Sequence, residues 1–111
     1  MKLVYALLFT ALLANTVLAQ SGCIINTPSP PRQCTFAVVA WGDCALPVTL
    51  VILDSPGGEV IDGPFTVDSG TDFAWLARFP AGTNVDFRLM DAAGDAAQSA
   101  IITIRPGPTD C

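Results

Sequence analysis

Histidine is absent from the sequence, and this absence excludes the commonest arrangements for hydrolysis. A nucleophilic serine or cysteine is usually activated by an imidazole base, so neither a Ser-His nor a Cys-His pair can form. Carboxylate pairs remain, but most acidic residues stand beside turn residues, where aspartate bonds to the local backbone. We therefore expect no enzymatic activity. The acids weighed for such a pair are Asp54, Glu59, Asp62, Asp68, Asp72, Asp86, Asp91 and Asp95.

Metal sites are also poorly supported. Zinc sites use histidine or paired CxxC motifs, and neither occurs in this sequence. Calcium loops carry acids at alternate positions, and the acids that flank residues 54–62 and 68–72 lack the DxDxDG spacing. We expect no metal and no other cofactor.

Lysine occurs once, at Lys2, in a segment with the features of a secretory signal peptide. Basic Met1-Lys2 precedes an apolar run over residues 3–14, and Val17-Leu18-Ala19 supplies small or compact residues for a signal peptidase. A membrane anchor needs about 20 apolar residues in a row, and this run ends too early. The sequence predicts a signal peptide over residues 1–19 and a mature chain over residues 20–111.

Basic residues are scarce in the mature chain. The whole sequence has 5 Lys+Arg against 10 Asp+Glu, and removal of Lys2 leaves 4 against 10, a net charge of −6. Nucleic acids and anionic membrane surfaces are bound by clustered lysine and arginine. Neither is expected as a partner, and the acidity favours solubility outside the cell.

All four cysteines, Cys23, Cys34, Cys44 and Cys111, lie in the mature part. An even number in a short secreted chain predicts two disulfides and an extracellular location. The count alone allows three pairings.

Residues 71–94 show the clearest strand pattern. Apolar side chains alternate with polar or small ones over residues 73–79 and again over residues 85–89, which is typical of strands with one buried face. Pro80-Ala81-Gly82-Thr83 places glycine where a type II turn needs positive φ, and Asp91-Ala92-Ala93-Gly94 suits a type I turn. The pattern predicts a hairpin followed by a second tight turn.

Further strands are expected over residues 23–27, 34–41, 47–53, 60–67 and 100–104. Gly63-Pro64 interrupts the fourth of these. The strand over residues 34–41 is apolar on both sides, so we expect at least part of it to be covered on both faces. Short strands separated by turns, without helical spacing, predict an all-β fold. The specific prediction is an immunoglobulin-like antiparallel β-sandwich of about seven strands.

Strand order in such a sandwich selects one pairing of the cysteines. The start of the first strand lies beside the end of the second, which brings Cys23 near Cys44. The last strand commonly runs parallel to the first, so its end brings Cys111 near Cys34. We predict disulfides Cys23–Cys44 and Cys34–Cys111.

Trp41 and Trp75 are candidates for glycan binding, because aromatic rings stack on the apolar faces of sugars. Both are in phase with neighbours that we expect to be buried, so core packing is the stronger interpretation. A sugar-stacking platform is the alternative.

A resemblance to a fungal protein family rests on motifs that follow one another along the mature chain. These are Gln33-Cys34, Trp41-Gly42, Pro47-Val48-Thr49-Leu50, Phe73-Ala74-Trp75, Pro80-Ala81-Gly82-Thr83, Asp91-Ala92-Ala93-Gly94, Gln98-Ser99 and the terminal cysteine. In their order and spacing, the chain resembles small secreted or wall-associated basidiomycete proteins with an immunoglobulin-like domain. That family is related to the yeast Kre9/Knh1 and Ser/Thr-rich GPI-anchored cell-wall proteins.

The resemblance implies a secreted β-sandwich at or near the fungal cell wall, and its yeast relatives are linked to β-1,6-glucan assembly. It carries over no catalytic residues. Many relatives continue into a Ser/Thr-rich tail with a GPI signal, whereas this sequence ends at Cys111. We therefore expect free secretion without a membrane anchor. Cys34 and Cys111 match the family's cysteine positions, and Cys23 and Cys44 look like an additional pair.

Two functional hypotheses follow. The first is a secreted, non-enzymatic protein with a structural or binding role at the fungal cell wall, associated with β-glucan. The second is a small secreted effector that binds a protein of a host or of the environment through exposed sheet edges. A glycan role predicts an accessible aromatic side chain, and an effector role predicts an exposed apolar patch. A carbohydrate-active enzyme would instead require two carboxylates that converge in a cleft.

Overall fold

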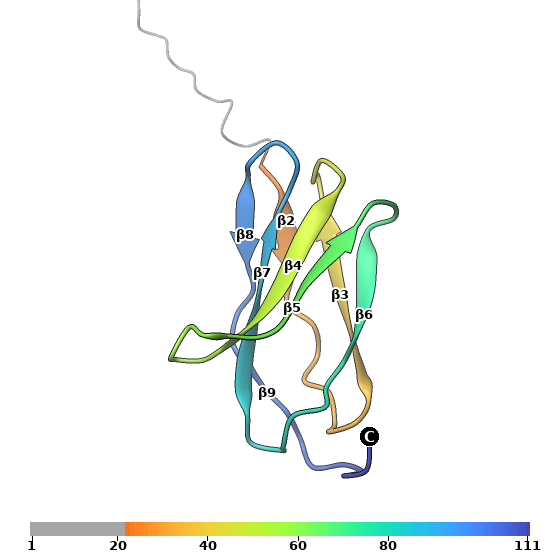
Figure 1. Ribbon diagram of the computed structural model, residues 1–111, viewed down its shortest axis with the longest axis vertical. Helices are drawn as coiled ribbons and strands as arrows, with labels where there is room; N and C mark the ends of the chain where they lie inside the picture. The colour runs from red at the N-terminus through yellow and green to blue at the C-terminus, as the bar shows by residue number, and fades with distance from the viewer. Residues whose placement is uncertain (1–21) are drawn as a thin grey trace, which may run out of the picture.

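The computed structural model describes residues 22–111, whose strands lie in two layers (Figure 1). The predicted signal peptide lies outside the described residues. The described part is all-β, as predicted, and it holds no apolar helix of membrane-spanning length. Its strands are β2 (Ile24–Asn26), β3 (Phe36–Gly42), β4 (Val48–Asp54), β5 (Val60–Val67), β6 (Asp72–Leu76), β7 (Asn84–Met90), β8 (Ala96–Gln98) and β9 (Ile102–Thr103).

The strands form two antiparallel sheets. One has the order β2-β3-β6, and the other has the order β5-β4-β7-β8, with β9 also paired to β7. A parallel bridge joins Arg32, which follows β2, to Arg105, which follows β9. The beginning and the end of the described chain therefore run parallel, which is the relation that the cysteine pairing assumed.

The core lies between the two sheets and follows the alternation seen in the sequence. On β3 the side chains of Ala37, Val39 and Trp41 are buried. Burial of apolar surface is the main favourable contribution to folding. The other buried core residues are Cys23, Val48, Leu50, Ile52, Trp75, Ala77, Val85, Phe87, Leu89, Ile102 and Ile104.

The predicted hairpin over residues 71–94 is wrong. β6 pairs with β3, whereas β7 pairs with β4, so the chain between them crosses from one sheet to the other. Trp75 and Phe87 meet edge to face across the core, with 5.3 Å between ring centroids. Alternation predicts one buried face for each strand, and two such faces can pack against each other from opposite sheets.

Both tight turns in this stretch are confirmed. The Thr83 N–H donates to the Pro80 carbonyl (3.1 Å), and Gly82 has a φ of 92°. The Gly94 N–H donates to the Asp91 carbonyl, also at 3.1 Å. These contacts are local, so a few residues determine them.

The interruption predicted in the fourth strand is a bulge within one continuous strand. β5 runs through Gly63-Pro64, and its register on β4 shifts between Leu50 and Ile52. Gly63 has a φ of 89°, and a Cβ built there would lie 2.9 Å from the Leu50 carbonyl oxygen. β5 is the edge strand of its sheet, where proline is tolerated because a ladder hydrogen bond is not required.

The strand predicted over residues 100–104 is shorter in the structure, where β9 covers only Ile102–Thr103. A strand that was not predicted, β8, precedes it and sets Gln98 opposite Arg88 of β7. The Ala-Ala-Gln sequence of β8 has little β propensity, so sequence gave no sign of this strand. The turn after β7 folds the chain back and places β8 on that strand.

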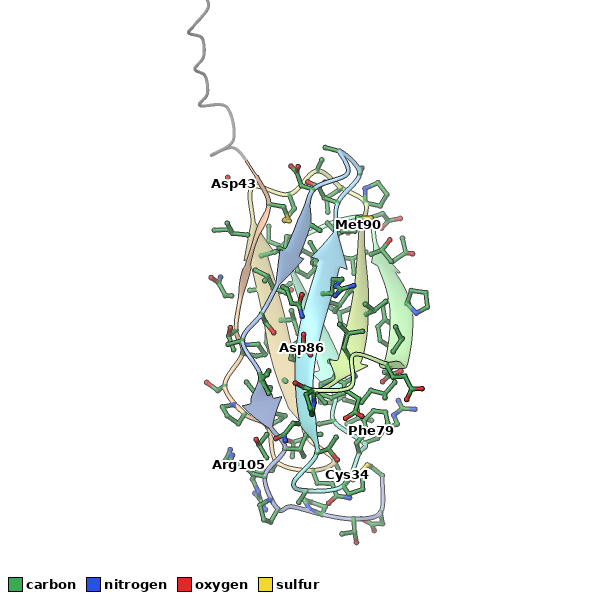
Figure 2. All side chains as sticks on the ribbon, turned by 90° about the vertical axis from the view of Figure 1, so that its left-hand side faces the viewer. Cys34, Asp43, Phe79, Asp86, Met90 and Arg105 are labelled. Atoms are coloured by element: carbon green, nitrogen blue, oxygen red, sulfur yellow. A yellow bond between two sulfur atoms is a disulfide. The ribbon has the colours of Figure 1, made fainter. Side chains whose placement is uncertain are left out.

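The structure contains disulfides Cys23–Cys44 and Cys34–Cys111, the two pairs expected from strand order. The first joins the start of β2 to the loop after β3, and the second joins the loop before β3 to the last residue. Figure 2 shows Cys34 at the end of the molecule opposite Asp43, which neighbours Cys44 in sequence. The two disulfides therefore constrain opposite ends of the fold.

Candidate binding site

The two tryptophans proposed as a sugar-stacking platform are core residues. Trp75 is 1% exposed and Trp41 is 5% exposed. Trp75 also donates from Nε1 to Asp62 Oδ2 of the other sheet, at 2.9 Å. The register places Trp75 opposite Ala37, four residues from Trp41 along β3, so the indoles form no joint surface. Stacking requires a ring face open to solvent, and neither indole offers one.

An apolar surface covers the outer face of the sheet β2-β3-β6. Phe36 and Val38, from the outward positions of β3, are 63% and 57% exposed. The register sets them opposite Leu76 and Ala74 of β6. We call this set the apolar face: Ile24, Phe36, Val38, Ala40, Ala74 and Leu76.

The prediction that β3 is covered on both faces is therefore wrong for Phe36 and Val38. Its inner side chains pack into the core, whereas nothing in residues 22–111 covers these two outer ones. Single exposed apolar side chains are common on proteins, but a cluster on neighbouring strands is typical of an interaction surface. The apolar face is the strongest candidate binding surface in the described residues.

A groove runs beside this face, along the edge of β3. Its volume is about 400 Å³, and it lies between the segment after β2 and the first half of β3. The Arg32 Nε–H donates to the Pro106 carbonyl (3.3 Å), and the Arg105 Nε–H donates to the Pro30 carbonyl (3.0 Å). We call this the edge groove, and its lining includes Ser29, Pro30, Arg32, Phe36, Val38 and Arg105.

A second pocket, of about 350 Å³, lies on the outer side of the other sheet. Asp86 of β7 is only 4% exposed, and its carboxylate accepts a hydrogen bond from Nε2 of Gln98 on β8. Figure 2 shows Asp86 between the two ends of the molecule. We call this the polar pocket, and its polar lining includes Asp54, Asp86, Arg88, Gln98 and Ser99.

Two of the acids that the sequence offered, Asp54 and Asp86, are among the residues that line the polar pocket. The register sets Asp86 opposite Leu53 and Asp54 opposite the buried Val85, so the two acids stand at positions of opposite parity and do not form a pair on one face of the sheet. Asp86 also has a structural role, because its bond to Gln98 joins β7 to β8. In the described part of the chain, no three metal-ligating side chains of the His, Cys, Asp or Glu type gather at one point.

Asp91 organises the end of the molecule near Met90 and Asp43 (Figure 2). Its carboxylate accepts from the N–H groups of Ala45 (2.9 Å), Ala93 (3.0 Å) and Asp95 (2.9 Å), and the side chain is 6% exposed. The bond from Ala45 is the largest influence on its pKa, which lies below the ordinary 3.8 although burial opposes the change. The ionised Asp91 carboxylate therefore joins the loop that contains Ala45 to the turn that contains Ala93 and Asp95.

No protein family model matches the chain, and no curated protein matches it significantly.

Proposed function

We propose that this protein is an extracellular binding protein without enzymatic activity, and that it recognises another protein through the apolar face. The exposure of Phe36 and Val38 at adjacent outward positions of β3 carries this proposal. Desolvation of such side chains is the main favourable contribution to protein association. The absence of histidine and lysine from residues 20–111 supports a binding role over an enzymatic one.

Location and fold belong to the same proposal. Two disulfides fit an extracellular environment, and the predicted signal peptide supplies a route to it. The sheet orders and the parallel relation of the Arg32 and Arg105 segments support an immunoglobulin-like sandwich. Together with the motif resemblance, these features support a secreted fungal protein that acts at the cell wall or beyond it.

Site-specific photo-cross-linking tests the protein-binding role. Benzoylphenylalanine replaces Phe36 on the apolar face or, as a matched control, Thr66, which is exposed on the outer side of β5. Each variant is irradiated in the extracellular protein fraction of the producing organism. The proposal expects a discrete adduct from position 36 that is lost on competition with unlabelled protein. Equal labelling at both positions, or none at either, contradicts it.

Wall polysaccharide at the polar pocket is the second candidate. Asp54, Arg88 and Gln98 offer several hydrogen-bonding groups around one cavity, which suits a ligand rich in hydroxyl groups. The test is a pull-down on insoluble chitin, β-1,3-glucan and β-1,6-glucan. Binding that is weakened by Arg88→Ala and unaffected by Val38→Thr assigns the pocket. If none of the three polysaccharides retains the native protein, this candidate is removed.

A further inference from the structure

Half of β3 has an unpaired edge. Along a strand, the backbone N–H and C=O groups of successive residues point alternately to the two neighbouring strands. The Trp41 N–H donates to the Thr71 carbonyl on the β6 side. Ala37 and Val39 are an even number of residues from Trp41, so their backbone groups also point toward β6. The N–H and C=O groups of Phe36 and Val38 therefore point the opposite way. On that side β2 pairs with β3 only from Ala40 onward, and no strand of the described chain continues the ladder.

Proline explains why the ladder stops. β2 pairs Ile24 with Gly42 and Asn26 with Ala40. Continued in this register, the chain would set Pro28 opposite Val38 and Pro30 opposite Phe36. Neither proline has an N–H to donate, so the segment leaves β3 and crosses to Arg105. The edge groove occupies the space that a longer β2 would have filled.

The groove is positively charged within an acidic protein. Two of the four arginines in residues 20–111, Arg32 and Arg105, line it, and its lining contains no acid. Each guanidinium donates its Nε–H to a backbone carbonyl, which restrains the side chain. The terminal nitrogens of each carry four further donors, in a geometry that matches a carboxylate.

We propose that the edge of β3 at Phe36 and Val38 binds an extended acidic segment of a partner protein by strand addition. The inference rests on the proposed protein-binding function and specifies how the partner is held. Backbone groups of the segment pair with the open N–H and C=O groups of β3. Its apolar side chains lie beside Phe36 and Val38 on the apolar face, and an acidic side chain reaches Arg32 and Arg105.

Charge selects this occupant over a second copy of the chain. A second copy would bring the same two arginines and no acid from its own edge groove. An extended acidic segment would supply backbone partners for the open edge of β3 and carboxylates for the two guanidinium groups.

Amide hydrogen exchange with defined peptides tests the proposal. The protein is produced with ¹⁵N by secretion from a eukaryotic host. The probes are an eight-residue peptide of alternating valine and glutamate and the same peptide with lysine in place of glutamate. Without peptide, the Phe36 and Val38 amides exchange fast, and the Ala37 and Val39 amides exchange slowly. At ten times its Kd, the glutamate peptide slows exchange at Phe36 and Val38 by about tenfold.

Arginine variants test the charge requirement. Arg32→Gln combined with Arg105→Gln weakens binding of the glutamate peptide by about fivefold. Arg78→Gln is the matched control, because Arg78 is exposed and lies outside the groove, and it leaves binding unchanged.

Several outcomes overturn the proposal. These are slow exchange of Phe36 and Val38 without peptide, equal protection by the lysine peptide, and no protection by either peptide. Protection that rises with protein concentration alone assigns the edge to a second copy and also overturns it. Adduct formation at position 36 without edge protection overturns strand addition but retains the apolar face as a docking surface. Absence of a specific adduct at position 36 contradicts the proposed function itself.

Discussion

Nε1 of Trp75 donates a 2.9 Å hydrogen bond to Oδ2 of Asp62, and this contact joins the two sheets along one side of the molecule. Asp62 lies on β5 and Trp75 on β6, the edge strands that meet on this side. Phe65 and Phe73 pack beside them, with ring centroids 4.8 Å apart. A polar and an aromatic contact therefore close this side of the core.

Asp62→Ala is expected to destabilise the fold by about 1–3 kcal/mol, because it leaves the buried indole N–H without an acceptor. The free energy of unfolding, measured by urea denaturation with circular dichroism, gives the value. Asp68→Ala is the matched control in an exposed turn, where a change within about 0.5 kcal/mol is expected. Equal effects of the two variants would show that the indole finds another acceptor.

Gly63→Ala is expected to destabilise the protein more than Gly70→Ala. Both glycines have positive φ, 89° and 83°, so alanine is strained at either position. At Gly63 the new Cβ also meets the Leu50 carbonyl, whereas at Gly70 nothing lies within 4 Å. The strain alone costs about 1 kcal/mol, so any excess at Gly63 measures the close approach of the bulge to β4. Equal losses in urea denaturation would contradict this reading of the bulge.

Removal of Cys34–Cys111 is expected to cost more stability than removal of Cys23–Cys44. The first pair is separated by 77 residues and the second by 21. On the chain-entropy model, these loops correspond to about 4 and about 3 kcal/mol. Double Cys→Ser variants of each pair are compared by urea denaturation, and the free energy of unfolding in water is extrapolated with each variant's own m-value, because loss of a disulfide expands the unfolded chain. A larger loss from the shorter loop would contradict the entropic explanation.

Asp91→Asn is expected to reduce the acid sensitivity of the fold. The pKa of Asp91 in the folded protein lies below 3.8, with the Ala45 N–H as the first cause. Stability from this carboxylate is therefore fully present above the unfolded-chain pKa and is lost as pH falls through the folded pKa. Urea denaturation between about pH 5 and about pH 2 should show a shallower loss for Asp91→Asn than for the native protein. A slope for Asp91→Asn equal to that of the native protein would contradict this role of the carboxylate.

Local features of this fold were predictable from sequence, because their determinants lie close together in the chain. Gly82 supplies the positive φ of its turn, and Asp91 with Gly94 forms the other turn. The alternation over residues 85–89 correctly identified Val85, Phe87 and Leu89 as buried. The cysteine pairing needed only the order and direction of the strands.

Features that depend on distant neighbours were not predictable. Alternation gives a strand a buried face without saying which strand lies beside it, so β6 and β7 were wrongly paired with each other. The same limit applies to Phe36, whose apolar character suggested a cover that the described residues do not supply. The open edge opposite Pro28 and Pro30 likewise depends on the register of β2 on β3, which the sequence does not contain.

Tryptophan fluorescence distinguishes core packing of the two indoles from the sugar-stacking alternative. Trp41 and Trp75 are the only two tryptophans in the sequence, so intrinsic emission reports on them alone. Because both are buried, we expect blue-shifted emission that iodide quenches weakly, and strong quenching after unfolding in urea. Soluble β-glucan oligosaccharides should leave the emission unchanged, even where the insoluble polymer retains the protein through the polar pocket. A saccharide-dependent shift would instead require a rearrangement that exposes an indole, and Trp41→Phe would then identify which ring responds.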